Sequence, residues 1–134
     1  MFLTACIQMS SNMEVKANLE RAEQYIRRAA SRGASLIVTP ENTALLGPKF
    51  HKVDEAEKLE GPIASHFSAL ADELDIHLLI GSMAEQRFDE KGQLDQQRCY
   101  NTSLLFDPKG QLINSYRKIH LFDVDVPGGL TINE

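Results

Sequence analysis

The stretch Leu36-Ile-Val-Thr-Pro-Glu-Asn42 joins a short apolar run to a proline and then to an acid. The three aliphatic residues from Leu36 to Val38 predict a buried β-strand. Pro40 marks the end of that strand, because proline has no N–H to donate to a central ladder. Glu41 therefore follows the carboxyl end of a buried strand. In open α/β sheets that edge usually carries the ligand-binding and catalytic groups.

Two further elements are expected before this strand. The apolar run from Phe2 to Ile7 predicts another buried strand. Ser11 and Glu14 have the spacing of a capping box at the start of a helix. Apolar residues then recur at intervals of three and four, which predicts a helix with one apolar face, closed by Gly33. The residues of this face are Val15, Leu19, Ala22, Ile26, Ala29 and Ala30.

After the strand, a polar and irregular stretch is expected from Glu41 to about Glu60. Pro62 follows Gly61 and suits the first position of a second helix. The apolar face of that helix consists of Ile63, Phe67, Leu70, Ala71 and Leu74.

The remaining elements are predicted as strands and loops. A third strand covers Ile76 to Ile80 and is bounded by Gly81, a surface loop covers Glu85 to Gln97, and a fourth strand covers Cys99 to Phe106. Asp107-Pro-Lys-Gly110 has the residue preferences of a type I turn. A fifth strand from Gln111 to about Tyr116 then completes a hairpin.

The expected order is β-α-β-α-β followed by a hairpin, which predicts an α/β chain with helices on one side of a mixed β-sheet. The last residues, Asp123 to Glu134, contain Pro127-Gly-Gly129 and lack a closing element. The ending therefore looks cut rather than finished, and we expect residues 1–134 to be one partial domain.

Composition excludes several classes of function. The net charge is −5, whereas nucleic-acid binding needs a concentrated basic face. No apolar run approaches the roughly twenty residues of a membrane span, and the start has no signal-peptide pattern. Two cysteines without a pairing motif suit a reducing compartment. We expect a cytoplasmic protein that binds neither nucleic acid nor membrane.

The residues themselves suggest two catalytic candidates. Glu41 could act as a general base if it is partly shielded, and the alternative is a solvent-facing acid that begins a loop. Lys118 follows the fifth strand and could stabilise an oxyanion, and the alternative is a solvated lysine at a strand end.

Other chemistry finds less support in the sequence. The four histidines lack metal-ligand spacing and the first strand is not followed by a glycine-rich loop, so neither a metal nor a cofactor is expected. Cys6 is expected to be a small buried hydrophobe. Cys99 lies next to Arg98, which could lower the pKa of its thiol slightly. Neither cysteine is expected to be a nucleophile.

Four motifs in order resemble the nitrilase, or carbon–nitrogen hydrolase, superfamily. They are Gln8 at the end of the first strand, Leu36 to Asn42, Tyr100-Asn-Thr102 and Tyr116-Arg-Lys-Ile-His-Leu-Phe122. The resemblance implies that the chain forms the N-terminal half of a four-layer αββα sandwich.

The same resemblance implies a glutamate–lysine–cysteine triad that acts on a small-molecule amide. Glu41 matches the general base, and Lys118 matches the lysine that stabilises the tetrahedral intermediate. Glu134 falls where many members have a second, supporting glutamate. The cysteine of the family lies downstream of the lysine, which places it beyond this chain.

The stretch from Phe122 to Gly129 is similar to the branch that holds omega-amidase and deaminated glutathione amidase. A small dicarboxylate monoamide or a deaminated peptide amide is therefore the implied substrate, and the full-length protein is expected to be a homo-oligomer.

Three hypotheses follow from these observations. The chain is a fragment of an active amidase, a truncated and inactive chain that acts at most as an interaction module, or a self-contained α/β binding module whose motifs are coincidental.

Overall fold

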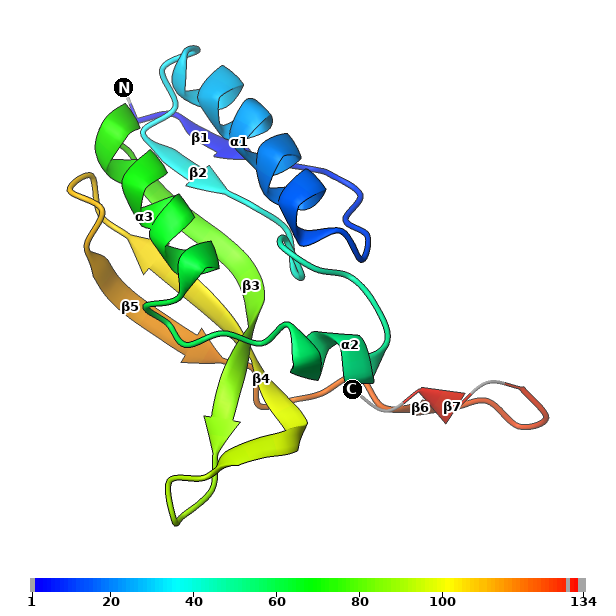
Figure 1. Ribbon diagram of the computed structural model, residues 1–134. Helices are drawn as coiled ribbons and strands as arrows, with labels where there is room; N and C mark the ends of the chain where they lie inside the picture. The colour runs from blue at the N-terminus through cyan, green and yellow to red at the C-terminus, as the bar shows by residue number, and fades with distance from the viewer. Residues whose placement is uncertain (1, 130, 133–134) are drawn as a thin grey trace.

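The computed structural model describes residues 2–129 and 131–132, and within them five strands form one mixed sheet in the order β1-β2-β3-β4-β5 (Figure 1). The first three strands run parallel, and the last two add as antiparallel strands. The strands are β1 (Thr4–Cys6), β2 (Leu36–Val38), β3 (His77–Phe88), β4 (Leu94–Phe106) and β5 (Leu112–Arg117). The mixed sheet of the sequence prediction is confirmed.

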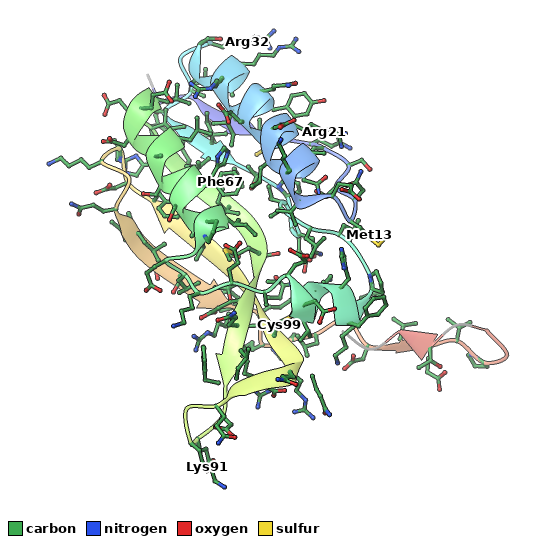
Figure 2. All side chains as sticks on the ribbon, viewed as in Figure 1. Met13, Arg21, Arg32, Phe67, Lys91 and Cys99 are labelled. Carbon is green, nitrogen blue, oxygen red and sulfur yellow. The ribbon has the colours of Figure 1, made fainter. Side chains whose placement is uncertain are left out.

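Two long helices cover one face of this sheet. α1 (Val15–Ala30) and α3 (Pro62–Leu74) lie side by side on it, as Figure 1 shows. Phe67 of α3 (labelled in Figure 2), Ile26 of α1 and Leu78 of β3 are fully buried in the core between the helices and the sheet. The expected packing of the helices on a single face is confirmed.

The opposite face of the sheet has no helix over it within the described residues, and we call it the open face. Strand register places five residues in one row across it, and all of them are exposed or half-buried. This row is Cys6, Val38, Leu79, Leu105 and Asn114. The prediction that Cys6 is a buried hydrophobe is wrong, because its side chain points to the open face of an edge strand.

The start of α1 also differs from the prediction. Glu14 is the N-cap residue, and no side chain caps the helix. Ser11 Oγ instead donates to the carbonyl of Thr43 at 3.0 Å, so it ties two loops together rather than capping the helix. The predicted end of the helix is confirmed, because Gly33 has a φ of 86° and its N–H donates to the carbonyl of Ala30.

β3 and β4 are longer than predicted and form a hairpin with each other. β3 continues through Gly81 to Phe88, and β4 begins at Leu94, so most of the expected surface loop from Glu85 to Gln97 is strand. The side chains of this part are polar because the two strands extend into solvent. Their backbone N–H and C=O groups are satisfied because the strands pair with each other. Lys91 (labelled in Figure 2) lies in the turn at the tip.

Two short elements were not predicted. α2 (Lys49–Asp54) lies in the stretch expected to be irregular, where it runs beside β3 and β4. β6 (Val124–Asp125) pairs with β7 (Thr131–Ile132) near the end of the chain. The predicted turn from Asp107 to Gly110 is confirmed by a 2.9 Å hydrogen bond from the N–H of Gly110 to the carbonyl of Asp107. Among the helices of the described residues, none has the length and apolar character that a membrane crossing requires.

Candidate active site

Residues 39–43, which we call the Glu41 loop, are attached to β3. The N–H of Asn42 donates to Ser82 Oγ at 2.8 Å, and the N–H of Thr43 donates to the carbonyl of Ser82 at 3.1 Å. A register shift between Ile80 and Met83 provides the irregularity at which these contacts form. The position of the backbone at Glu41 is therefore set by β3 and not by the loop alone.

Gly81 is required where the Glu41 loop crosses β3. A Cβ atom at this position would lie 2.4 Å from the carbonyl oxygens of both Thr39 and Pro40. The Gly81 N–H donates to Thr39 Oγ1 at 3.2 Å, and Thr43 Oγ1 lies 2.7 Å from that same oxygen. Only a glycine lets the two backbones approach this closely.

The end of β5 is held by an ion pair whose carboxylate is buried. Glu85, on β3, is only 5% exposed. Arg117 donates to it through Nε at 2.9 Å and Nη2 at 2.6 Å, and Thr102 Oγ1 donates to it at 2.6 Å. The guanidinium group also lies over the ring of Tyr100, 4.2 Å from its centre. These contacts fix the residue that immediately precedes Lys118.

Both members of this ion pair have shifted pKa values. Burial acts to raise the pKa of Glu85, but the hydrogen bonds from Arg117 and Thr102 outweigh burial and hold the pKa below its ordinary value. The hydrogen bond to Glu85 raises the pKa of Arg117. Both groups are therefore charged at neutral pH, and the ion pair persists there.

The structure brings Glu41 and Lys118 together. Lys118 Nζ lies 3.0 Å from Glu41 Oε1, although the two residues are 77 positions apart in the chain. Asn101 Nδ2 donates to the same oxygen at 2.8 Å, and the carbonyl of Asn101 accepts the N–H of Lys118 at 2.8 Å. Three elements thus converge on one carboxylate: the Glu41 loop, β4 and the segment after β5.

Glu41 and Lys118 line the same cavity, which has a volume of ≈ 760 Å³. The side chain of Glu41 is 51% exposed and that of Lys118 is 27% exposed. Cys99, labelled in Figure 2, also lines this cavity, whereas Cys6 lies on the far edge strand β1. The third candidate from the sequence, Glu134, lies outside the described residues.

Known proteins resemble this chain over nearly its whole length. The profile of the carbon–nitrogen hydrolase family matches residues 3–134. The chain belongs to the carbon–nitrogen hydrolase family. It is 38% identical to human omega-amidase NIT2 over 134 residues, which are 99% of this chain and 45% of the human protein. It is 35% identical to deaminated glutathione amidase of Synechocystis over 130 residues, which are 97% of this chain and 46% of that protein.

The fold of this carbon–nitrogen hydrolase chain also matches a solved structure. The NitFhit protein of C. elegans superposes with a TM-score of 0.79 at 26% sequence identity, over 98% of this chain and 31% of that chain. The predicted nitrilase-like fold is confirmed, and the hypothesis that the motifs are coincidental is wrong. The chain spans about half the length of the curated relatives it matches.

Sequence reasoning missed the contribution of Asn101 to the site. Asn101 belongs to a family motif on a predicted strand, and the sequence indicates no role for its side chain. Its contact with Glu41 depends on how β4 and β5 pair with the rest of the sheet, which local sequence does not show. The lysines of α2 were missed because that helix was expected to be irregular loop. Both Lys49 and Lys52 line the cavity.

Proposed function

We propose that this carbon–nitrogen hydrolase chain supplies the general base and the oxyanion-stabilising cation of an amidase. The observation that supports this most directly is the 3.0 Å contact between Glu41 and Lys118 at the wall of an open cavity. A carboxylate and an ammonium group beside one cavity suit the hydrolysis of an amide through a thiol, with Glu41 as base and Lys118 as cation.

We place the thiol in a part of the protein that follows residue 134, as the family resemblance implies. In the first step, the S–H proton passes to Glu41, and the thiolate attacks the amide carbon. The carbonyl oxygen becomes an oxyanion, which Lys118 stabilises. The C–N bond then breaks while Glu41 gives its proton to the departing nitrogen, so that ammonia leaves and a thioester remains.

The second half of the reaction uses water. Glu41 accepts a proton from a water molecule, whose oxygen attacks the thioester carbon. The C–S bond then breaks, a carboxylic acid forms, and the proton on Glu41 returns to the sulfur. Glu41 thus acts twice as a base and twice as an acid, and the enzyme ends in its starting state.

The ion pair between Glu41 and Lys118 couples these roles. While Glu41 is ionised, its carboxylate attracts the ammonium group at 3.0 Å. Protonation of Glu41 removes the negative charge of its carboxylate from beside Lys118. The ammonium group then interacts less with Glu41 and more with the oxyanion, which forms in the same step. We infer that proton uptake by Glu41 strengthens the electrostatic stabilisation of the intermediate.

The charge of the cavity supports a substrate that carries a carboxylate as well as an amide. Its described lining contains more cationic than anionic side chains, although the chain as a whole has a net charge of −5. The cations are Lys49, Lys52, Arg87, Arg98 and Lys118, and the anions are Glu41 and Asp123. The names of the two relatives, omega-amidase and deaminated glutathione amidase, fit the same substrate class. We therefore propose a dicarboxylate monoamide such as 2-oxoglutaramate, or deaminated glutathione, as substrate.

The test uses the full-length protein that carries this chain, assayed for ammonia release from both compounds. Replacement of Glu41→Gln or Lys118→Ala is expected to lower kcat by at least ~100-fold, because a single positioned acid–base or oxyanion-stabilising group contributes about that much. Glu90→Gln and Lys91→Ala, in the turn of the β3–β4 hairpin, are matched controls and should leave kcat unchanged. Near-native turnover in either site variant would refute the assigned roles.

The second candidate is a truncated, inactive chain that acts as an interaction module. The open face of the sheet favours it, because half-buried Val38, Leu79 and Leu105 could bind a partner there. Reading the coding sequence past Glu134 separates the two candidates. A cysteine in a Cys-Tyr-Asp or Cys-Phe-Asp run supports the amidase, and an immediate stop codon supports the interaction module.

A further inference from the structure

Glu41 Oε1 is held by two donors from different parts of the chain. Asn101 Nδ2 lies 2.8 Å from this oxygen, and Lys118 Nζ lies 3.0 Å from it. Among the described residues, no donor contacts Glu41 Oε2. The two oxygens of this carboxylate are therefore in different environments, although Glu41 itself is half exposed on a loop.

Asn101 is placed rigidly enough to act as an anchor. It lies within β4, opposite Ala84 of β3, and its carbonyl accepts the N–H of Lys118. The next residue, Thr102, is fully buried and donates to Glu85. The backbone of Asn101 is thus held by β3 on one side and by the segment after β5 on the other, so its amide group can fix the half-exposed carboxylate of Glu41.

The loop itself does not depend on Asn101. Its backbone is already attached to β3 through Thr39, Asn42 and Thr43, as described above. The hydrogen bond that Asn101 donates to Glu41 is made to the side-chain oxygen and not to the backbone of the loop. Its effect is therefore on the orientation of the carboxylate rather than on the folding of the loop.

We propose that Asn101 is a positioning residue that, together with Lys118, anchors Oε1 of Glu41 and leaves Oε2 as the oxygen that exchanges protons. This inference rests on the proposed amidase function. The S–H bond of the nucleophile breaks as the O–H bond at Oε2 forms, so the carboxylate becomes a carboxylic acid and the thiol a thiolate. Without the anchor, Glu41 rotates among several rotamers, and only a fraction of them present an oxygen to the thiol.

The experiment is a double-mutant cycle in the full-length protein. Asn101→Ala is expected to lower kcat about tenfold, which is the effect of one lost hydrogen bond to a charged group, with KM within about twofold of the wild type. Asn101→Asp keeps the shape but loses the donor and adds a like charge, so its kcat should fall at least as far. Asn114→Ala, on the neighbouring strand β5, is the matched control and should change neither constant.

The cycle separates positioning from a general structural effect. In the Glu41→Gln background, Asn101→Ala should produce no further loss of kcat, because Asn101 acts through Glu41. An equal tenfold loss in both backgrounds would overturn the inference, and so would wild-type kcat in Asn101→Ala or Asn101→Asp. These outcomes leave the proposed function intact as long as Glu41→Gln is inactive. An active Glu41→Gln variant would overturn both.

Discussion

At the scale of single residues, two arginine–glutamate pairs differ in how deeply the carboxylate is buried. The side chain of Glu85 is 6% exposed beneath Arg117, whereas that of Glu73 is 59% exposed beside Arg27. Both arginines donate two short hydrogen bonds to their partner. Removing Arg117 should therefore lower the free energy of unfolding more than removing Arg27, because the carboxylate of Glu85 would be left without contact with water.

Replacing Arg117→Met is expected to lower the free energy of unfolding at pH 7 by about 2–3 kcal/mol, somewhat less than for a fully buried pair because the arginine is half exposed. The matched variant Arg27→Met breaks the exposed pair with Glu73 and a second contact with Glu23, and it should cost less, as is usual for ion pairs at the surface. Urea unfolding followed by circular dichroism measures both values. Equal losses in the two variants would mean that the burial of Glu85 contributes little.

The same pair predicts how stability depends on pH. The pKa of Glu85 in the folded protein is lowered from its ordinary value of 4.5. The stability that this shift contributes is therefore present above pH 4.5 and is lost as the pH falls through the folded-state pKa. In Arg117→Met that contribution is absent, so the difference in the free energy of unfolding between wild type and variant should become smaller below pH 4.5. A difference in the free energy of unfolding that stays the same from pH 7 down to pH 3 would contradict this prediction.

At the scale of elements, the crossing of the Glu41 loop over β3 decides where the candidate base lies. A β-carbon at Gly81 would meet the backbone of Thr39 and Pro40 at 2.4 Å. Backbone atoms cannot move aside as a flexible side chain can. Any larger residue must therefore push the loop, and Glu41 with it, away from β3.

Gly81→Ala is expected to destabilise the chain by about 1–3 kcal/mol, the usual cost of forcing an extra carbon into a packed site. Gly92→Ala is the control, because no atom lies within 4 Å of a Cβ there and only its positive φ of 74° opposes the substitution. That backbone effect is about 1 kcal/mol. In the full-length protein, Gly81→Ala should also lower kcat, whereas Gly92→Ala should not. If Gly92→Ala lowered stability and kcat more than Gly81→Ala did, the position of the loop would not depend on this crossing.

At the scale of the whole molecule, the sheet has one face covered by helices and one open face. Adjacent residues of β3 illustrate the difference, because Leu78 is fully buried under the helices and Leu79 is half-buried on the open face. Leu79 lies in register with Val38 and Leu105, so aliphatic side chains form a continuous row there. Such a surface promotes association between chains.

The 134-residue chain on its own is therefore expected to self-associate, and Leu79→Lys should reduce that association while the chain stays folded. Leu78→Lys is the matched control and should unfold the chain, because it buries a charge without a partner. Sedimentation velocity measures the association, and circular dichroism measures the folding. Unchanged association in a folded Leu79→Lys variant would exclude this row as the contact surface.

Several elements were predictable because their signals are local. The apolar face of α1, the glycine that closes this helix, the proline that opens α3 and the turn before β5 all follow from the spacing of nearby residues. The extension of β3 and β4 was missed because its side chains are polar, and only pairing between the two strands keeps it extended. The contact of Asn101 with Glu41 was missed because it joins residues 60 positions apart.

The sequence by itself determined the α/β class, the strand that ends before Pro40, and Glu41 and Lys118 as the two charged residues of the candidate site. It could do so because apolar periodicity, proline and the family motifs are properties of the chain alone. Only the tertiary structure decided that Lys118 lies 3.0 Å from Glu41, that Asn101 shares the same oxygen, and that Cys6 is exposed. Those facts depend on strand register and on which face the helices cover, and both arise from contacts between distant segments.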